Sequence, residues 1–307
     1  MALVRPDKSK VNPKFLHYYF LSSKWKATVE SNVISGATVD RVPIAKFPDF
    51  EVEIPLIRIQ DRIASTLSAY DNLIENNRRR IALLEEAARL LYREWFVHLR
   101  FPGHEHTPVV DGIPEGWTKG SIADFYDTSS GGTPSRKRPE FYTGDINWVK
   151  TKELQNRFIL ETEEKITNEA IQRSSAKLFP ENTVLVAMYG ATIGEIGILA
   201  NESATNQACC ALCAKQSPAN YAFMYLFLRE NKQGLVNLSQ GAAQRNISQT
   251  IIRSYPMLMP QPGLLNRFTN IIVPLLQQML NLQLQSERLT QARDLLLPRL
   301  MNGEIAA

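Results

Sequence analysis

The sequence predicts an α+β fold: a domain with a twisted, mostly antiparallel sheet, and two long helices that pair as an antiparallel coiled coil. Three observations predict it: two stretches of the chain repeat one another, each repeat carries a long heptad pattern, and short apolar runs with turn signals lie between them. With 307 residues, 44% hydrophobic and 21% charged, the chain is long enough for two domains and has an ordinary globular composition.

The internal repeat relates the beginning of the chain to its end. At an offset of 205 residues, the stretch from Gly36 matches the stretch from Gly241. Upstream, with three residues fewer in the second copy, residues 15–19 fall on 223–227. Only the second copy follows a stretch of about a hundred residues from Trp117 onwards. We therefore expect the first copy to lack the beginning of its domain.

The first long helix is predicted by residues 57–96, which contain neither Pro nor Gly. Two apolar series, each with a spacing of seven residues, run through this segment and are typical of a coiled-coil seam. About forty helical residues would span ~60 Å. Asn77 in the seam is the kind of polar residue that fixes register. The expected seam residues of this helix are Ile63, Leu67, Tyr70, Ile74, Asn77, Ile81, Leu84 and Leu91.

The second long helix keeps one of these series, at Leu275, Leu282, Leu289 and Leu296. Its other series is weaker, and Pro274 is expected to bend the helix or to lie near its start. Neither helix can bury its seam alone, so we expect each to pair with the other within the chain. The alternative is that each helix packs only on its neighbouring globular domain.

The intervening domain begins after a linker rich in Pro and Gly at residues 101–116. Short apolar runs at 146–149, 183–188 and 196–200 predict strands, the last two of them buried, and residues 221–230 predict a helix. This mixture is typical of an α+β domain.

Polar and cationic side chains gather in the turns of this domain. Residues 129–138 are expected to form a flexible, hydroxyl-rich turn that leads into three cations. Hydroxyls, backbone N–H groups and cations contact phosphates, whereas Arg, Gln and Asn can bond to base edges. The alternative for each residue is a solvated polar loop. The candidate DNA-contacting residues are Ser130, Thr133, Ser135, Arg136, Lys137, Arg138, Lys150, Lys152, Tyr189, Thr192, Gln244, Arg245 and Asn246.

Motifs for catalysis or metal binding are not found in the sequence. It has no glycine-rich phosphate loop, and Pro13 is expected to begin a helix. A fourth zinc ligand is missing near Cys209, Cys210 and Cys213, so we expect these cysteines to serve as small apolar residues in a buried strand. We expect no catalytic residue, metal site or disulfide. Without a signal peptide or an apolar membrane span, a cytoplasmic protein is expected.

Several motifs, in this order, resemble the target recognition domain of type I restriction–modification specificity (S) subunits. They lie at residues 114–117, 131–135, 146–149 and 204–207. The helices at 63–96 and 296–305 resemble the central and C-terminal conserved spacers of that family. By this resemblance the chain looks N-terminally truncated: 1–53 is the remnant of a first recognition domain, 54–100 the central spacer helix, 101–116 a linker, 117–259 a complete recognition domain and 260–307 the C-terminal spacer helix.

The resemblance implies a non-catalytic subunit that reads a half-site in double-stranded DNA and scaffolds methylation (M) subunits, which restriction (R) subunits join. A net charge of +4 permits such binding. S-adenosylmethionine, ATP and Mg²⁺ are then expected in the partner subunits, and no cofactor in this chain. Two such half-subunits could self-associate into a reader with two domains. The alternative is a truncated assembly or decoy protein that binds M subunits without reading DNA.

Overall fold

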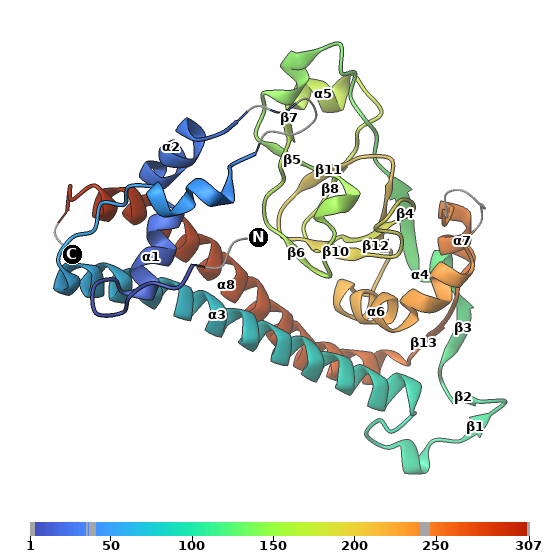
Figure 1. Cartoon of the computed structure of the whole chain (residues 1–307). Helices are drawn as coiled ribbons and strands as arrows, with labels where there is room; N and C mark the ends of the chain where they lie inside the picture. The colour runs from blue at the N-terminus through green and yellow to red at the C-terminus, as the bar shows by residue number, and fades with distance from the viewer. Residues whose placement is uncertain (1–3, 35, 37–40, 240–245, 306–307) are drawn as a thin grey trace. The chain divides into compact units, whose positions relative to one another are not determined.

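The computed structural model describes residues 4–34, 36, 41–239 and 246–305 (Figure 1). It divides into two compact units: Met1–Arg80 with Leu282–Ala307, and Ile81–Asn281. Two long helices, α3 (Ile57–Tyr92) and α8 (Pro262–Met301), contribute residues to both units. Among the described residues, no helix is both long and apolar enough to cross a membrane.

The first unit is helical and is centred on α1 (Pro13–Phe20). The side chain of Asn12 caps this helix by accepting hydrogen bonds from the backbone N–H groups of Lys14, at 2.8 Å, and Phe15, at 3.2 Å. Pro13 occupies the first turn, which confirms the prediction for that residue. Two short helices follow, α2 (Ser23–Ser31) and η1 (Ile44–Asp49). The core consists of Phe15, Tyr18, Tyr19, Ile63, Ala64, Leu67 and Leu300.

Within the first unit, α3 and α8 run antiparallel. Arg293 of α8 forms an ion pair of 2.6 Å with Asp71, whereas Gln285, earlier in α8, accepts a hydrogen bond of 3.1 Å from Asn77, later in α3. Along the contact, residue numbers therefore increase on α3 while they decrease on α8, which shows that the two helices are antiparallel. The hydroxyl of Tyr18 donates to the second carboxylate oxygen of Asp71, so α1 also joins this polar network.

The predicted seam residues differ in burial. Ile63, Leu67, Ile74, Asn77 and Leu282 are buried, and Tyr70, Ile81, Leu84, Leu91, Leu275, Leu289 and Leu296 are partly exposed. Near Pro274, Ile272 and Leu276 are fully buried and Leu275 is not. Helix α8 continues through Pro274, which lies about a third of the way along its length.

The second unit contains two principal sheets. The five-stranded sheet has the order β4-β12-β9-β10-β6, and only its β10–β6 pair is parallel. The four-stranded sheet has the order β7-β5-β11-β8, and only its β11–β5 pair is parallel. The strands are β4 (Tyr126–Ser130), β5 (Ile146–Val149), β6 (Arg157–Ile159), β7 (Lys165–Ile166), β8 (Leu178–Phe179), β9 (Val184–Ala187), β10 (Ile196–Leu199), β11 (Ser203–Thr205) and β12 (Cys209–Ala214). These sheets and the long helices confirm the predicted α+β class.

The interior of the five-stranded sheet is apolar because every residue of β9 and β10 is buried. Cys209 and Cys210 are buried in β12, as predicted, whereas Cys213 near the end of the same strand is only partly buried. Helix α6 (Tyr221–Asn237) packs on β9, β10 and β12, and its residues 222–228 are all buried. Figure 1 shows α6 beside this sheet.

Two antiparallel strands pair at the ends of the segment that carries both sheets, residues 122–255, which we call the sheet-bearing segment. In register, β3 (Thr118–Ser121) pairs along its whole length with β13 (Pro256–Met259). The backbone N–H of Ile122 donates to the carbonyl oxygen of Tyr255 at 3.0 Å and extends the pairing. The remaining short elements of this unit are η2 (Arg93–Val97), η3 (His104–His106), β1 (Val109–Val110), β2 (Ile113–Pro114), α4 (Ile122–Phe125), η4 (Pro139–Tyr142), η5 (Thr151–Glu153), α5 (Asn168–Gln172) and α7 (Gln249–Ser254).

An aromatic cluster binds the long helices to the rest of the second unit. The ring of Phe268 in α8 lies 4.7 Å from that of Phe96 and 5.6 Å from that of Trp95, between ring centroids. Phe96 also contacts Phe223 of α6 at 5.2 Å and Trp117 at 5.8 Å. Aromatic pairs in this range add stability beyond the area that they bury. The α8 segment of this unit and η2, which follows α3, are therefore packed through rings.

Candidate nucleic-acid interface

The turn that follows β4 is held tightly, so the predicted flexibility is wrong. The backbone N–H of Gly132 donates to the carbonyl oxygen of Thr205 at 3.0 Å, and its own carbonyl accepts from the indole of Trp148 at 3.1 Å. A Cβ on Gly131 would lie 1.9 Å from the Thr205 oxygen, and one on Gly132 would lie 2.1 Å from Oγ of Ser175. The two glycines therefore allow the turn to pack closely against Thr205 and Ser175, and this packing positions the start of the cationic segment that follows.

Arg136 is held by a carboxylate and two rings. Its Nη1 and Nη2 atoms donate to the two oxygens of Glu164 at 3.1 and 2.7 Å. Its guanidinium lies 4.2 Å from the ring centroid of Tyr142 and 5.2 Å from that of Trp148. The hydrogen bond with Glu164 raises the pKa of Arg136, and the same bond lowers the pKa of Glu164. Both groups are therefore charged at neutral pH.

Two lysines after β5 join this arrangement. The ammonium of Lys150 lies 3.1 Å from Glu163 and 3.4 Å from Glu164, and Lys152 also pairs with Glu163. Glu153 accepts the backbone N–H of Lys150 at 2.5 Å and that of Glu163 at 3.1 Å. Burial raises the pKa of Glu153. This carboxylate ties the lysine segment to the glutamate segment.

Arg138 forms a separate group on the same turn. It pairs with Glu140 at 2.7 Å and with Glu169 at 3.2 Å, and its guanidinium lies 4.1 Å from the ring centroid of Phe141. Lys137 is exposed, and among the described residues no hydrogen-bond or ion-pair partner reaches it. Lys137 is therefore the cation of this turn most available to an external anion.

Other candidates lie around β4 and the start of α7. Ser130 donates to Gln249 of α7 at 3.3 Å, and Tyr189 forms an isolated β-bridge with Asn246. Burial raises the pKa of Tyr189. The remaining candidates are Thr133, which donates to Gln207 at 2.6 Å, the exposed Ser135, and the partly exposed Thr192. Gln244 and Arg245 lie outside the described residues.

The structure thus brings Arg136, Lys150 and Lys152 together, and the sequence reasoning missed the residues that join them. Those residues are Glu163 and Glu164, which precede β7. The acidic run at 161–164 was the available signal, because it offers carboxylates in the same domain as the cation run at 136–138.

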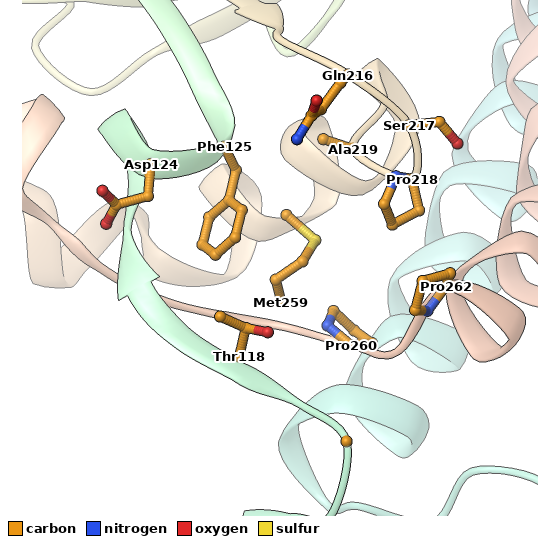
Figure 2. Close-up of a pocket in the computed structure, with 11 residues that line it drawn as sticks. Thr118, Asp124, Phe125, Gln216, Ser217, Pro218, Ala219, Met259, Pro260 and Pro262 are labelled. Atoms are coloured by element: carbon orange, nitrogen blue, oxygen red, sulfur yellow. The ribbon is translucent and has the colours of Figure 1, made fainter.

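A hollow of about 170 Å³ lies elsewhere in the second unit, between β3, the loop before α6 and the start of α8 (Figure 2). Phe125, Pro218 and Met259 give it a mainly apolar lining. The carboxylate of Asp124 accepts hydrogen bonds from the backbone N–H and hydroxyl of Ser121, at 2.7 and 2.8 Å, and points away from Met259. None of the candidate DNA-contacting residues lines this hollow. No group of three or more His, Cys, Asp or Glu side chains in the described part of the chain could hold a metal ion.

Comparisons with known proteins agree with the motifs. A family model described as the type I restriction modification DNA specificity domain matches residues 1–86 and 114–287. The type I restriction enzyme MjaIX specificity subunit of Methanocaldococcus jannaschii is 24% identical over 94% of this chain and 68% of its own length. The HindI specificity subunit of Haemophilus influenzae is 24% identical over 99% of this chain and 80% of its own length.

A solved structure shows the same fold. The crystal structure of a type I restriction–modification S subunit from M. genitalium superposes with a TM-score of 0.61, at 17% identity, over 96% of this chain and 74% of that one. The family match extends over most of this chain, including the candidate cations from Arg136 to Lys152. The chain therefore belongs to the family of type I restriction–modification specificity subunits, as its motifs predicted.

Proposed function

We propose that this chain reads part of a DNA target for a type I restriction–modification complex, and that its long helices scaffold the M subunits. The observation that carries the DNA-reading part is the group of cations beside the end of β5, at Arg136, Lys137, Lys150 and Lys152. The family model, which describes a DNA specificity domain, supports it. Cations on a rigid turn position a protein on phosphates, and neighbouring polar side chains can then reach base edges.

Lys137 provides the cleanest test of phosphate contact. Replacing Arg136 would also break its pair with Glu164 and its ring contacts, so its effect would mix structure with binding. We expect Lys137→Ala to weaken binding and to reduce the slope of log K against log salt by about 0.9, the value for one phosphate contact on B-DNA. The matched control is Lys119→Ala in β3, which Figure 1 places at the other end of the second unit from β7 and α5.

A sequence-selection experiment separates the reader from the decoy. The chain is purified with its M subunit and is incubated with a random-sequence duplex pool, and the bound DNA is sequenced. A reader enriches a motif, whereas an assembly or decoy protein binds M subunits and enriches none. Methylome sequencing of a host that carries this gene and its M partner would give the same motif. Failure to enrich any motif, with an unchanged salt slope for Lys137→Ala, refutes DNA reading.

An exposed apolar stripe on α3 supports the scaffolding part. In the second unit, Leu83 and Leu90 of α3 are 71% and 51% exposed and are seven residues apart. They therefore share a helix face that the pairing with α8 does not bury. We expect Leu83→Glu/Leu90→Glu to abolish co-purification with the M subunit and to leave the thermal midpoint of the isolated chain unchanged. Retained co-purification refutes this assignment.

Partner subunits would supply the chemistry in this scheme. S-adenosylmethionine is expected in the M subunits, and ATP and Mg²⁺ in the R subunits, while this chain contributes recognition. Self-association of two copies, which would bring a second recognition domain, is a separate part of the proposal. It predicts a concentration-dependent molar mass in light scattering of the isolated chain, and a constant monomer mass contradicts it.

A further inference from the structure

We propose that Glu163 and Glu164 act as an intramolecular brake on DNA binding, because they occupy cations that phosphates would otherwise bind. This inference rests on the DNA-reading function proposed above. It concerns three cations from two segments, Arg136, Lys150 and Lys152, all paired with these two adjacent carboxylates.

The geometry of the pairs is set by the backbone. The N–H of Trp148 in β5 donates to the carbonyl oxygen of Glu164 at 3.2 Å, and the hydroxyl of Thr162 donates to the same oxygen at 2.6 Å. Glu153 accepts the N–H of Glu163 at 3.1 Å. The glutamate segment is therefore bonded to β5, the strand that precedes the lysines, and this holds its carboxylates within reach of the three cations.

Two of the three cations also lie where DNA could reach them. The side chains of Arg136 and Lys152 are 54% and 56% exposed and that of Glu163 is 61% exposed, whereas Lys150 is 20% exposed. Exposed ion pairs contribute little stability, so a phosphate can replace the carboxylate. Each replacement nevertheless leaves a glutamate without its partner beside the negative DNA backbone. A cation that exchanges a carboxylate for a phosphate therefore adds less to the free energy of DNA binding than a free cation does. Sequence-independent binding depends mainly on phosphate contacts, so we expect the glutamates to weaken that binding most.

The salt dependence of binding distinguishes this brake from a structural role. A cation that is free before binding contributes about 0.9 to the slope of log K against log salt. A cation that must first leave a carboxylate contributes less, because that carboxylate recruits a counterion from solution. Removing both carboxylates should therefore make the slope steeper by about 2 to 3, for the three cations released.

The experiment measures binding of a random-sequence duplex to the full chain by fluorescence anisotropy over a salt series. For Glu163→Gln/Glu164→Gln we expect affinity at low salt to rise on the order of tenfold or more, with the steeper slope. The matched control is Glu181→Gln/Glu202→Gln, which removes the same charge from exposed glutamates that form no ion pair among the described residues. If both pairs of substitutions raise affinity equally, net charge is the cause and the brake is refuted.

A second arm assigns the gain to particular cations. Adding Lys150→Ala/Lys152→Ala to the double glutamine variant should remove most of the gain, since these lysines are two of the three cations that loss of the carboxylates frees. An undiminished gain, or no gain in the double glutamine variant, overturns the inference. Should that variant lose its cooperative thermal unfolding, Glu163→Gln alone provides the test, because within the described part of the chain Glu163 forms ion pairs only with the two lysines.

The two proposals fail separately. If Lys137→Ala reduces the salt slope and a motif is enriched while the glutamine variant binds as the wild type does, only the brake is refuted. If the wild type enriches no motif and Lys137→Ala leaves the salt slope unchanged, while the glutamine variant binds random DNA more tightly than the wild type, the reading function is refuted and the brake on non-specific DNA binding is supported.

Discussion

Replacing Leu67 by Ala tests the packing of the first unit most directly. Leu67 is fully buried in α3, in the core that also contains Phe15, Tyr19 and Leu300. The substitution removes three carbon atoms, at about 0.8 kcal/mol each, and leaves a cavity that adds to the loss. We expect the free energy of unfolding to fall by about 3 kcal/mol. For a unit of roughly a hundred residues, this lowers the thermal midpoint on the order of 12 °C or more.

The assay is thermal and urea unfolding followed by far-UV circular dichroism, with Leu83→Ala as the control. Leu83 lies on the same helix and is 71% exposed, so the change in helix propensity is the same and only burial differs. We expect the control to stay within about 0.5 kcal/mol of the wild type. Equal shifts for the two variants, or a loss below about 1 kcal/mol for Leu67→Ala, would refute the described core, because a buried leucine in close packing cannot be removed so cheaply.

Three further outcomes are expected. Gly132→Ala should lower the free energy of unfolding of the second unit, measured with urea, by about 1–3 kcal/mol because its Cβ meets Ser175, whereas Gly263→Ala, which meets no atom within 4 Å, should be neutral or stabilising. Burial opposes ionisation of Asp71, but its hydrogen bonds, including that from Arg293, leave its pKa lowered. The ionised carboxylate therefore stabilises the folded state above about pH 4, and this stabilisation is lost on further acidification. Asp71→Asn should remove that part of the pH dependence of the unfolding midpoint. A thiol reagent should label only Cys213 in the native protein and all three cysteines in denaturant, since burial raises the pKa of the other two thiols; labelling of all three in the native state contradicts this.

The helices could be predicted further than their contacts. A seven-residue spacing records which face of α3 is apolar, and together with the folded domain that separates the two helices it was enough to expect an antiparallel partner in α8. It does not record which residues around a proline face the opposite surface. Leu275 was chosen from the spacing, yet Ile272 and Leu276 are the fully buried residues on either side of Pro274. The heptad pattern is a property of one helix, whereas the burial of each residue depends on the surface that packs against that helix.

The sheets show the same division. The apolar runs of β9 and β10 were visible as strands, but sheet order was not, because β4 pairs with β12 across some eighty intervening residues. Gly131 and Gly132 looked like a source of flexibility in the sequence. Their actual role depends on Thr205, which approaches from a distant strand.

The candidate site was predictable in its residue types and not in its pairing. Arginine and lysine in a turn identify where phosphate contacts are chemically suitable. Whether such a cation is free depends on acidic residues that reach it through the fold. Arg136 and Glu164 are 28 positions apart in the chain, so their spacing carries no indication of the contact. Lys137 lies between two arginines that form ion pairs, and its residue type alone did not indicate that it would differ from them in having no ion-pair partner among the described residues.

The pairing of β3 with β13 has a consequence for exchange of sequence between related genes. In this ribbon, Thr118 lies opposite Met259 and Ser121 lies opposite Pro256, so the polypeptide that carries both sheets enters and leaves through adjacent strands, about 5 Å apart. A different insert of any length could begin and end at these strands without altering their separation. Recombination within the ribbon would therefore transfer a whole sheet-bearing segment, with its cations and carboxylates together, as one cassette.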